Sequence, residues 1–190
     1  MSLLMLNLNR KKLKKGRLLF EMASKTFLNL APKKKQRITT ALLTEFSHYP
    51  LVKAQVARII KNADIARGAF YKYFDDLTDA YDYIYRCALA DIRPHLSSNS
   101  SATELLDATR DFLTATSASP YFEFIKLHLT VNEKTIVFTD HKRQLAPKRW
   151  ALINLCHQTI CEAMLDPKHT ADYLARLEAV SLTLFPTQKG

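Results

Sequence analysis

Apolar residues recur three or four positions apart along most of the chain that follows Pro32, which is the spacing of one face of an α-helix. Proline is favoured at the first position of a helix. Four apolar residues keep this spacing as far as Tyr49, namely Ile38, Leu42, Leu43 and Phe46. The pattern therefore predicts an amphipathic helix from residue 32 to about residue 49.

Three further helices are expected before residue 93. Apolar spacing predicts a short helix over about 54–61 and an aromatic-rich helix over 65–74, with only a few residues between them. A longer helix is expected over 77–92. Its first turn carries Asp79, as the positive end of the helix dipole favours.

The second half of the chain shows the same periodicity after a Ser-rich loop at residues 97–101. Helices are expected there over about 102–116, 120–130, 133–146, 147–165 and 169–185, with prolines between several of them. Only 3 of the 190 residues are glycine, too few for the positive-φ turns of a hairpin-rich fold. Pattern and composition together predict an all-α fold.

The formal net charge of +10 is confined to the start of the chain. Residues 1–37 hold eleven Lys and Arg against one acidic residue, Glu21, whereas residues 38–190 are balanced. Residues 1–31 are therefore expected to form a basic arm, partly helical or without fixed structure, that contacts a polyanion such as nucleic acid or an anionic membrane. A second hypothesis is that the natural protein starts at Met22 and lacks residues 1–21.

Metal, cofactor and catalytic chemistry find little support in the sequence. Cys156, His157 and Cys161 are residue types that ligate metals, but the spacing i, i+1 and i+5 does not place them on one helix face. No Gly-rich phosphate loop and no assignable pair of nucleophile and base accompany them. We expect no metal site, no cofactor and no enzymatic activity. Three cysteines and the lack of an 18-residue apolar run predict a cytoplasmic protein.

The helices expected at 54–61 and 65–74, with their tight break, form a helix-turn-helix pattern. In the second of them, the residues expected to face the core are Ile65, Phe70, Phe74 and part of Tyr73. The residues that face outward are then Arg67, Gly68, Ala69, Tyr71 and Lys72. Small residues there let the backbone approach a DNA groove, and an arginine can donate to a guanine edge or a phosphate. Glycine inside a helix costs about 0.5–1 kcal/mol relative to alanine, so Gly68 is expected to have a function.

The stretch Ile65–Phe74, with its Gly-small-aromatic-Tyr-x-Tyr-Phe core, resembles the helix-turn-helix of the TetR/AcrR family of bacterial transcriptional regulators. The resemblance extends more loosely from Arg37 to Ile92, about 55 residues. It implies an all-helical homodimer whose first three helices bind DNA, whose fourth helix leads to a ligand-binding domain and whose last two long helices form the dimer interface. The implied domains are residues 32–92, with the motif at about 55–74, and residues 93–190.

Some residues depart from the family pattern. Asp64 stands where a glycine is usual in the turn, and aspartate tolerates a left-handed backbone. The usual Ser or Thr caps are replaced by Lys53-Ala54-Gln55 before the second helix and by Ala66 before the third. Leu77 replaces the basic residue that commonly opens the fourth helix and contacts phosphate, although the Thr78 hydroxyl can donate there.

Basic residues and the resemblance together give the candidate DNA contacts, which are Lys33, Lys34, Lys35, Arg37, Lys53, Gln55, Arg67, Gly68, Ala69, Tyr71, Lys72 and Thr78. Candidates for a ligand cavity, for which a core position is the commoner alternative, are Tyr81, Tyr85, Phe112, Tyr121 and Phe124. Dimerisation is expected over residues 147–185, through Trp150, Ile153, Leu155, Ile160, Met164, Leu174, Leu177, Val180 and Leu184.

The expected function is a homodimeric, sequence-specific transcriptional repressor that binds a near-palindromic double-stranded DNA operator and is released by a small molecule. Two alternatives stay open. One is a regulatory subunit of the same fold that acts through a protein partner, motivated by Leu77 and the weak helix caps. The other is a membrane-surface protein anchored by residues 1–21.

Overall fold

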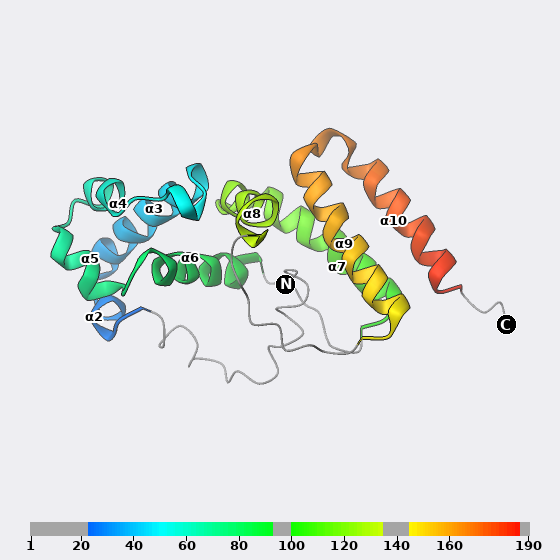
Figure 1. The fold of residues 1–190 in the computed structure, drawn as a ribbon, viewed down its shortest axis with the longest axis horizontal. Helices are drawn as coiled ribbons and strands as arrows, with labels where there is room; N and C mark the ends of the chain where they lie inside the picture. The colour runs from blue at the N-terminus through cyan, green and yellow to red at the C-terminus, as the bar shows by residue number, and fades with distance from the viewer. Residues whose placement is uncertain (1–22, 93–99, 135–144, 187–190) are drawn as a thin grey trace. The chain divides into compact units, whose positions relative to one another are not determined.

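The computed structural model describes residues 23–92, 100–134 and 145–186. Helices make up nearly all of these ranges, and no strand occurs within them, which confirms the all-α fold class. The α-helices are α2 (Lys25–Leu28), α3 (Pro32–His48), α4 (Val56–Ala63), α5 (Arg67–Tyr73), α6 (Leu77–Ile92), α7 (Ala102–Ser117), α8 (Phe122–Thr130), α9 (Pro147–Leu165) and α10 (Thr170–Leu184) (Figure 1). Short 3₁₀ turns are η2 (Leu51–Lys53), η3 (Asn132–Lys134) and η4 (Pro167–His169).

The predicted helices that fall on described residues agree with these bounds to within about two residues at each end, the usual uncertainty of a helix terminus. The exception is the helix expected over 133–146. Its first residues belong to the 3₁₀ turn η3, residues 135–144 lie outside the described ranges, and α9 begins at Pro147.

The chain divides into two compact units. The N-terminal unit comprises described residues 23–91 and 120–132, and the C-terminal unit comprises described residues from 92–119 and 133–186. Helix α8 thus belongs to the N-terminal unit, where it packs against α3, although α7 precedes it in the chain. The domain boundary between residues 92 and 93 stays a prediction.

Aromatic and branched side chains fill the core of the N-terminal unit. Helix α3 packs against α4 and α8, and α5 packs against α2 and α4. The side chains that these contacts bury completely include Phe27, Ile38, Leu42, Phe46, Ile59, Phe70, Ile84 and Phe124. Four of the eight are phenylalanines, and such rings contribute both area and edge-to-face contacts.

Residues 23–30 are part of this core, whereas the sequence assigned them to a basic arm. The Phe27 ring is fully buried and lies 4.9 Å from the Phe74 ring and 5.1 Å from the Tyr83 ring, centroid to centroid. The Ser24 hydroxyl donates to the Lys72 carbonyl at 2.6 Å, which attaches α2 to the end of α5. The sequence prediction missed this buried residue because lysines dominate the composition of the segment. Residues 1–22, and with them the hypothesis of a start at Met22, lie outside the described residues.

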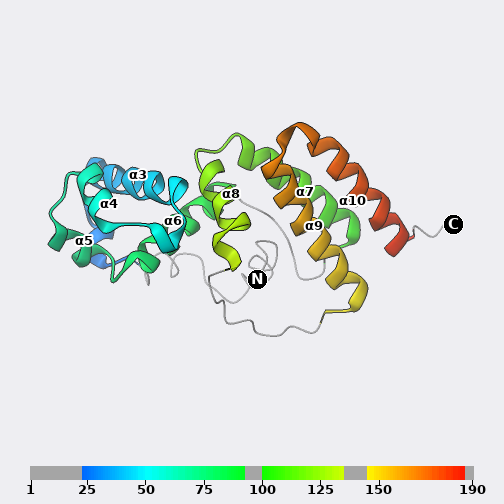
Figure 2. The same cartoon turned by 45° about the horizontal axis from the view of Figure 1, so that its top comes forward.

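The C-terminal unit is built from α7, α9 and α10. Helix α9 packs against both others, and α9 and α10 run side by side from the turn η4 (Figure 2). The core holds Leu105, Phe112, Leu152, Ile153, Cys156, Ile160, Met164 and Leu177. Two ion pairs join the helices on the outside: Arg110 of α7 with Glu178 of α10 at 2.7 Å, and Arg176 of α10 with Glu162 of α9. None of the described helices combines the length and the apolar character that crossing a membrane requires.

Candidate nucleic-acid interface

The aromatic residues on the inner face of α5 anchor this helix in the core of the N-terminal unit. Phe70 is fully buried, and Tyr73 and Phe74 are buried to within a few per cent. The Phe70 ring lies 5.6 Å from the Phe74 ring, and the Phe27 ring lies 5.7 Å from the Tyr73 ring. These contacts fix the rotation of α5, so the remaining side chains must point outward.

The turn between α4 and α5 depends on Asp64. Its backbone is left-handed, with φ 49° and ψ 59°, and it is the one non-glycine residue with positive φ among those described. The Ile65 N–H donates to the Ile60 carbonyl at 3.1 Å across this turn, as in a Schellman ending. The prediction that aspartate could replace glycine here is confirmed.

Four of the five residues expected on the outer face of α5 are exposed: Arg67, Gly68, Tyr71 and Lys72. The fifth, Ala69, is half-buried. Nearly half of the surface of Tyr71 is exposed, a large fraction for an aromatic residue. Arg67 Nη2 lies 3.5 Å from the Tyr71 hydroxyl, and its guanidinium carbon lies 5.7 Å from the ring centre. The two side chains therefore share one exposed face.

No crowding within the chain requires a glycine at position 68. A Cβ atom placed on it would meet no other atom within 4 Å. Alanine would fit and would favour the helix. Any advantage of glycine at this position therefore comes from something outside this chain that approaches the α5 backbone.

The start of α4 is held by a buried glutamate on α3. Glu45, only 2% exposed, accepts the N–H of Gln55 at 2.8 Å and Arg58 Nη2 at 2.6 Å. This bond raises the pKa of Arg58 above its ordinary value. Arg58 also donates to the Lys53 carbonyl at 2.8 Å. Neither Gln55 nor Ala66 caps its helix with a side chain, as predicted, and before α4 the Glu45 carboxylate holds the cap residue Gln55 through its backbone N–H.

Sequence reasoning missed this role of Glu45. The residue lies on the apolar stripe of α3, seven positions after Ile38 and next to Phe46. A carboxylate within an apolar stripe is rarely buried without a partner. That position was the signal that a basic partner, here Arg58, would lie opposite.

The basic residues at the start of α3 have different surroundings. Lys33 and Lys34 are exposed, whereas Lys35 Nζ donates to the Leu28 carbonyl at 3.3 Å. Arg37 donates to the Asp64 carbonyl at 3.2 Å and lies 3.7 Å from its carboxylate, with about half of its side chain exposed. Arg37 thus holds the turn at Asp64, and Lys35 holds the end of α2.

The start of α6 is acidic. Thr78 is exposed, but Asp76 Oδ1 accepts the Asp79 N–H at 2.8 Å and Asp79 Oδ2 accepts the Asp75 N–H at 3.0 Å. Partial burial raises the pKa of Asp79. These carboxylates occupy the positive end of the helix, where a phosphate would otherwise bind.

The ligand candidates lie in different units and are largely core residues. In the N-terminal unit, Tyr81 is 1% exposed, its hydroxyl lies 2.9 Å from His128 Nδ1 and it accepts from Asn132 Nδ2 at 3.1 Å. Tyr85 and Phe124 pack in the same cluster, and Tyr121 is half-buried. Phe112, 2% exposed, belongs to the C-terminal unit. Their role in ligand binding stays a prediction.

The cysteine and histidine cluster on α9 has internal partners. Cys156 is buried, which raises the pKa of its thiol. His157 Nε2 lies 2.7 Å from Glu133 Oε2, and the Cys161 sulfur lies 3.9 Å from the same nitrogen. Within the described ranges, no group of three such side chains is arranged to hold a metal ion.

The apolar residues expected in a dimer interface fall into three classes, of which the half-buried one comprises Leu155, Leu174 and Leu184. Ile153, Ile160, Met164 and Leu177 are buried within the chain, so they are core residues of the C-terminal unit. Trp150 is 58% exposed and Val180 36%. Leu165 and Leu182, which the sequence did not single out, are 61% and 54% exposed on α9 and α10.

Comparison with known proteins gives a likeness at the level of structure. No protein-family profile and no curated protein matches the sequence. Among solved structures, the chain is similar to a TetR family transcriptional regulator from Chloroflexus aurantiacus J-10-FL, with a TM-score of 0.49 and 19% sequence identity over 88% of this chain and 83% of that one. Function is therefore inferred from the α5 face itself.

Proposed function

We propose that the chain is a DNA-binding transcriptional regulator that reads its site through α5. The outer face of α5 carries the proposal, because Arg67, Tyr71 and Lys72 are exposed on a helix whose rotation is fixed from behind. Gly68, on the same face, leaves the backbone open to a neighbouring molecule. An exposed helix of this kind enters the DNA major groove in helix-turn-helix proteins.

The other candidate contacts suit the phosphate backbone. Lys33, Lys34 and Lys53 are exposed cations of the same unit. Contacts of this kind position a protein on DNA without reading sequence. Lys35 and Arg37 support this role indirectly, by holding Leu28 and the Asp64 turn in place.

Selection of bound fragments from random DNA, followed by fluorescence anisotropy on the enriched sequence, tests the proposal. We expect Arg67→Ala to weaken binding by about 10- to 100-fold, since one bidentate base contact contributes about 1–3 kcal/mol. The matched control is Lys126→Ala, which removes one cation from α8 of the same unit. Equal affinity of Arg67→Ala and the unsubstituted protein, with folding intact, would remove Arg67 from the site.

The proposal includes a homodimer on a near-palindromic operator, acting as a repressor that a small molecule releases. The exposed apolar residues Trp150, Leu165, Val180 and Leu182 support self-association through α9 and α10, because isolated apolar side chains of this size gain by leaving water. Two copies of α5 would then read half-sites about 34 Å apart or at a related spacing. A coupling of about 1–3 kcal/mol between ligand and DNA would suffice for release.

A second candidate function is regulation through a protein partner. The acidic start of α6 favours it, since Asp75, Asp76 and Asp79 would repel a phosphate backbone. Random-DNA selection separates the two functions. Enrichment of a defined sequence supports a DNA-binding regulator. The absence of enrichment by a folded dimer supports regulation through a protein partner.

A further inference from the structure

The arginine in the first turn of α9 has an unusual environment. Arg149 Nη1 donates to the Ser100 carbonyl at 2.5 Å, which joins the start of α9 to the segment before α7. Its Nε and Nη2 atoms are buried and have no hydrogen-bond partner among the described residues. Buried polar atoms are nearly always hydrogen-bonded, and an arginine cannot escape the cost by losing its charge.

The two atoms without partners form one edge of the guanidinium. Nε–H and the adjacent Nη2–H point the same way in the guanidinium plane. This edge matches two oxygen atoms of a carboxylate or phosphate, which it binds through parallel charge-assisted hydrogen bonds. Because Nη1 is already bonded to Ser100, the guanidinium is held in one orientation.

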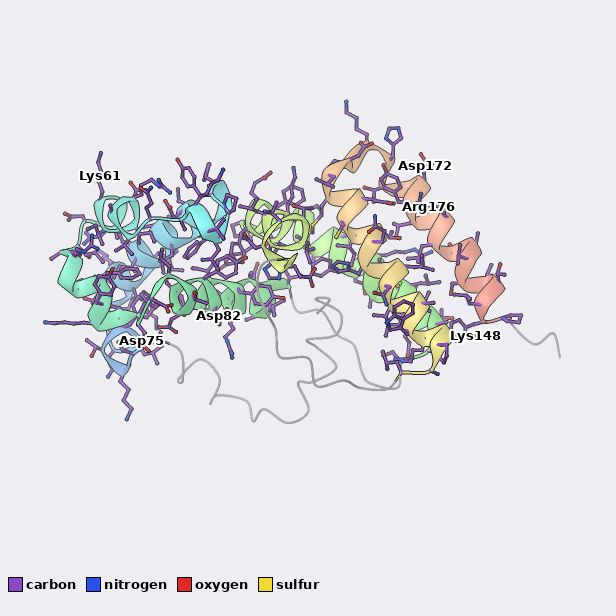
Figure 3. All side chains as sticks on the ribbon, in the orientation of Figure 1. Lys61, Asp75, Asp82, Lys148, Asp172 and Arg176 are labelled. Carbon is purple, nitrogen blue, oxygen red and sulfur yellow. The ribbon has the colours of Figure 1, made fainter. Side chains whose placement is uncertain are left out.

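The N-terminus of α9 adds to the same attraction. Its cap residue is Ala146, no side chain caps the helix, and its first turn contains no acidic residue. Lys148 lies in this turn as well (Figure 3). The free N–H groups and the positive end of a 19-residue helix favour an anion. Helix α7 differs, because Ser101 and Glu104 complete a capping box at its start.

We propose that Arg149 and the start of α9 bind the oxyanion of a small molecule, a carboxylate or phosphate group. The proposed function then makes this molecule the effector, and only that designation rests on the proposed function. The effector would then carry an anionic group. The aromatic ligand candidates gave no indication of its charge.

Thermal unfolding of the full chain at fixed ionic strength tests the site, with sodium chloride replaced stepwise by sodium phosphate in one series and by sodium acetate in another. We expect the midpoint to rise and level off in at least one series, because a ligand that binds the native state stabilises it. The series that responds identifies phosphate or carboxylate. Equal midpoints in all three salts would overturn the proposal.

Variants connect the response to Arg149. Arg149→Gln should abolish the rise, and Arg149→Lys, which keeps the charge but loses the two-pronged edge, should weaken binding at least about tenfold. The control Lys168→Gln removes an exposed cation at the other end of α9 and should keep the full response. An unchanged response in Arg149→Gln would contradict the assignment.

Stability in chloride alone separates a binding residue from a structural one. With two unpaired buried donors removed, Arg149→Gln should unfold at or above the midpoint of the unsubstituted protein. A midpoint several degrees lower in chloride would show a structural arginine and overturn the proposal. All these measurements omit DNA, so a failure of the DNA-binding proposal leaves their outcome intact, and Arg67→Ala should keep the full anion response.

Discussion

The two units of this chain differ in what they leave on their surfaces. The N-terminal unit has a core rich in phenylalanine, and its exposed α5 face carries cations and a glycine. The C-terminal unit attaches α10 through a narrow seam, in which Leu177 and Ser181 are its buried residues, and it leaves apolar side chains outside. A charged face suits a polyanion, whereas an apolar face suits a second protein surface. One small chain can present both kinds of surface because each unit has its own core.

The largest effect is expected at the anchor of the N-terminal unit. Phe27→Ala removes a fully buried ring that contacts the aromatic residues of α5 and α6, so we expect a loss of about 3–5 kcal/mol in the free energy of unfolding. Urea denaturation monitored by circular dichroism measures it. Val52→Ala, at a residue 73% exposed, should cost almost nothing. A loss below about 1 kcal/mol would show that α2 is dispensable to this core.

The exposed apolar side chains of the C-terminal unit are expected to have the next largest effect. Leu182→Glu replaces one of these side chains by a charge, and we expect it to weaken dimerisation by on the order of 2 kcal/mol, about 30-fold in the dissociation constant. Sedimentation equilibrium measures the constant. Ala171→Glu, at an exposed position in the first turn of the same helix, serves as the control and should leave it unchanged. Equal constants for both variants would place the dimer interface elsewhere.

A smaller effect concerns the pH dependence of the C-terminal unit. Hydrogen bonds with the Cys161 sulfur and the Glu133 carboxylate raise the pKa of His157 from 6.5 to about 10. Because the folded-state value lies above the unfolded one, this stabilisation is complete below about pH 6.5 and is lost as pH rises towards 10. Partial exposure reduces it to on the order of 1 kcal/mol.

Thermal unfolding from pH 6 to pH 10 measures that effect. The decline should be less steep in His157→Gln, which can still donate to Glu133 but does not titrate. Parallel declines in the two proteins would show that the His157 pair contributes no pH dependence.

The smallest expected change in stability is at Gly68. Gly68→Ala should raise the free energy of unfolding by about 0.5 kcal/mol, because the added methyl group meets nothing within the chain. It should at the same time lower affinity for the selected DNA, because the methyl group keeps the α5 backbone from the groove. Urea denaturation and fluorescence anisotropy measure the two changes. A more stable variant with unchanged DNA affinity would leave Gly68 without a role in binding.

Local pattern was enough to predict much of α5. The aromatic spacing from Ile65 to Phe74 fixed which side of the helix faces inward, and exposure of Arg67, Tyr71 and Lys72 follows from it. The left-handed turn at Asp64 could also be predicted, because few residue types adopt the left-handed backbone conformation. Phe27 was misassigned because the lysines around it outweighed one aromatic residue in the composition of the segment.

The sequence alone was enough for most of the helices, their inner faces and the helix-turn-helix pattern with its outward cations, since these depend on residues within a turn or two of each other. Tertiary structure alone decided the pairing of Glu45 with Arg58, the burial of Ile153 and Met164, and the unpaired edge of Arg149. Each of these depends on side chains from different helices or on atoms that surround a residue in space. Periodicity along one helix shows which side is buried, but it does not show what covers that side.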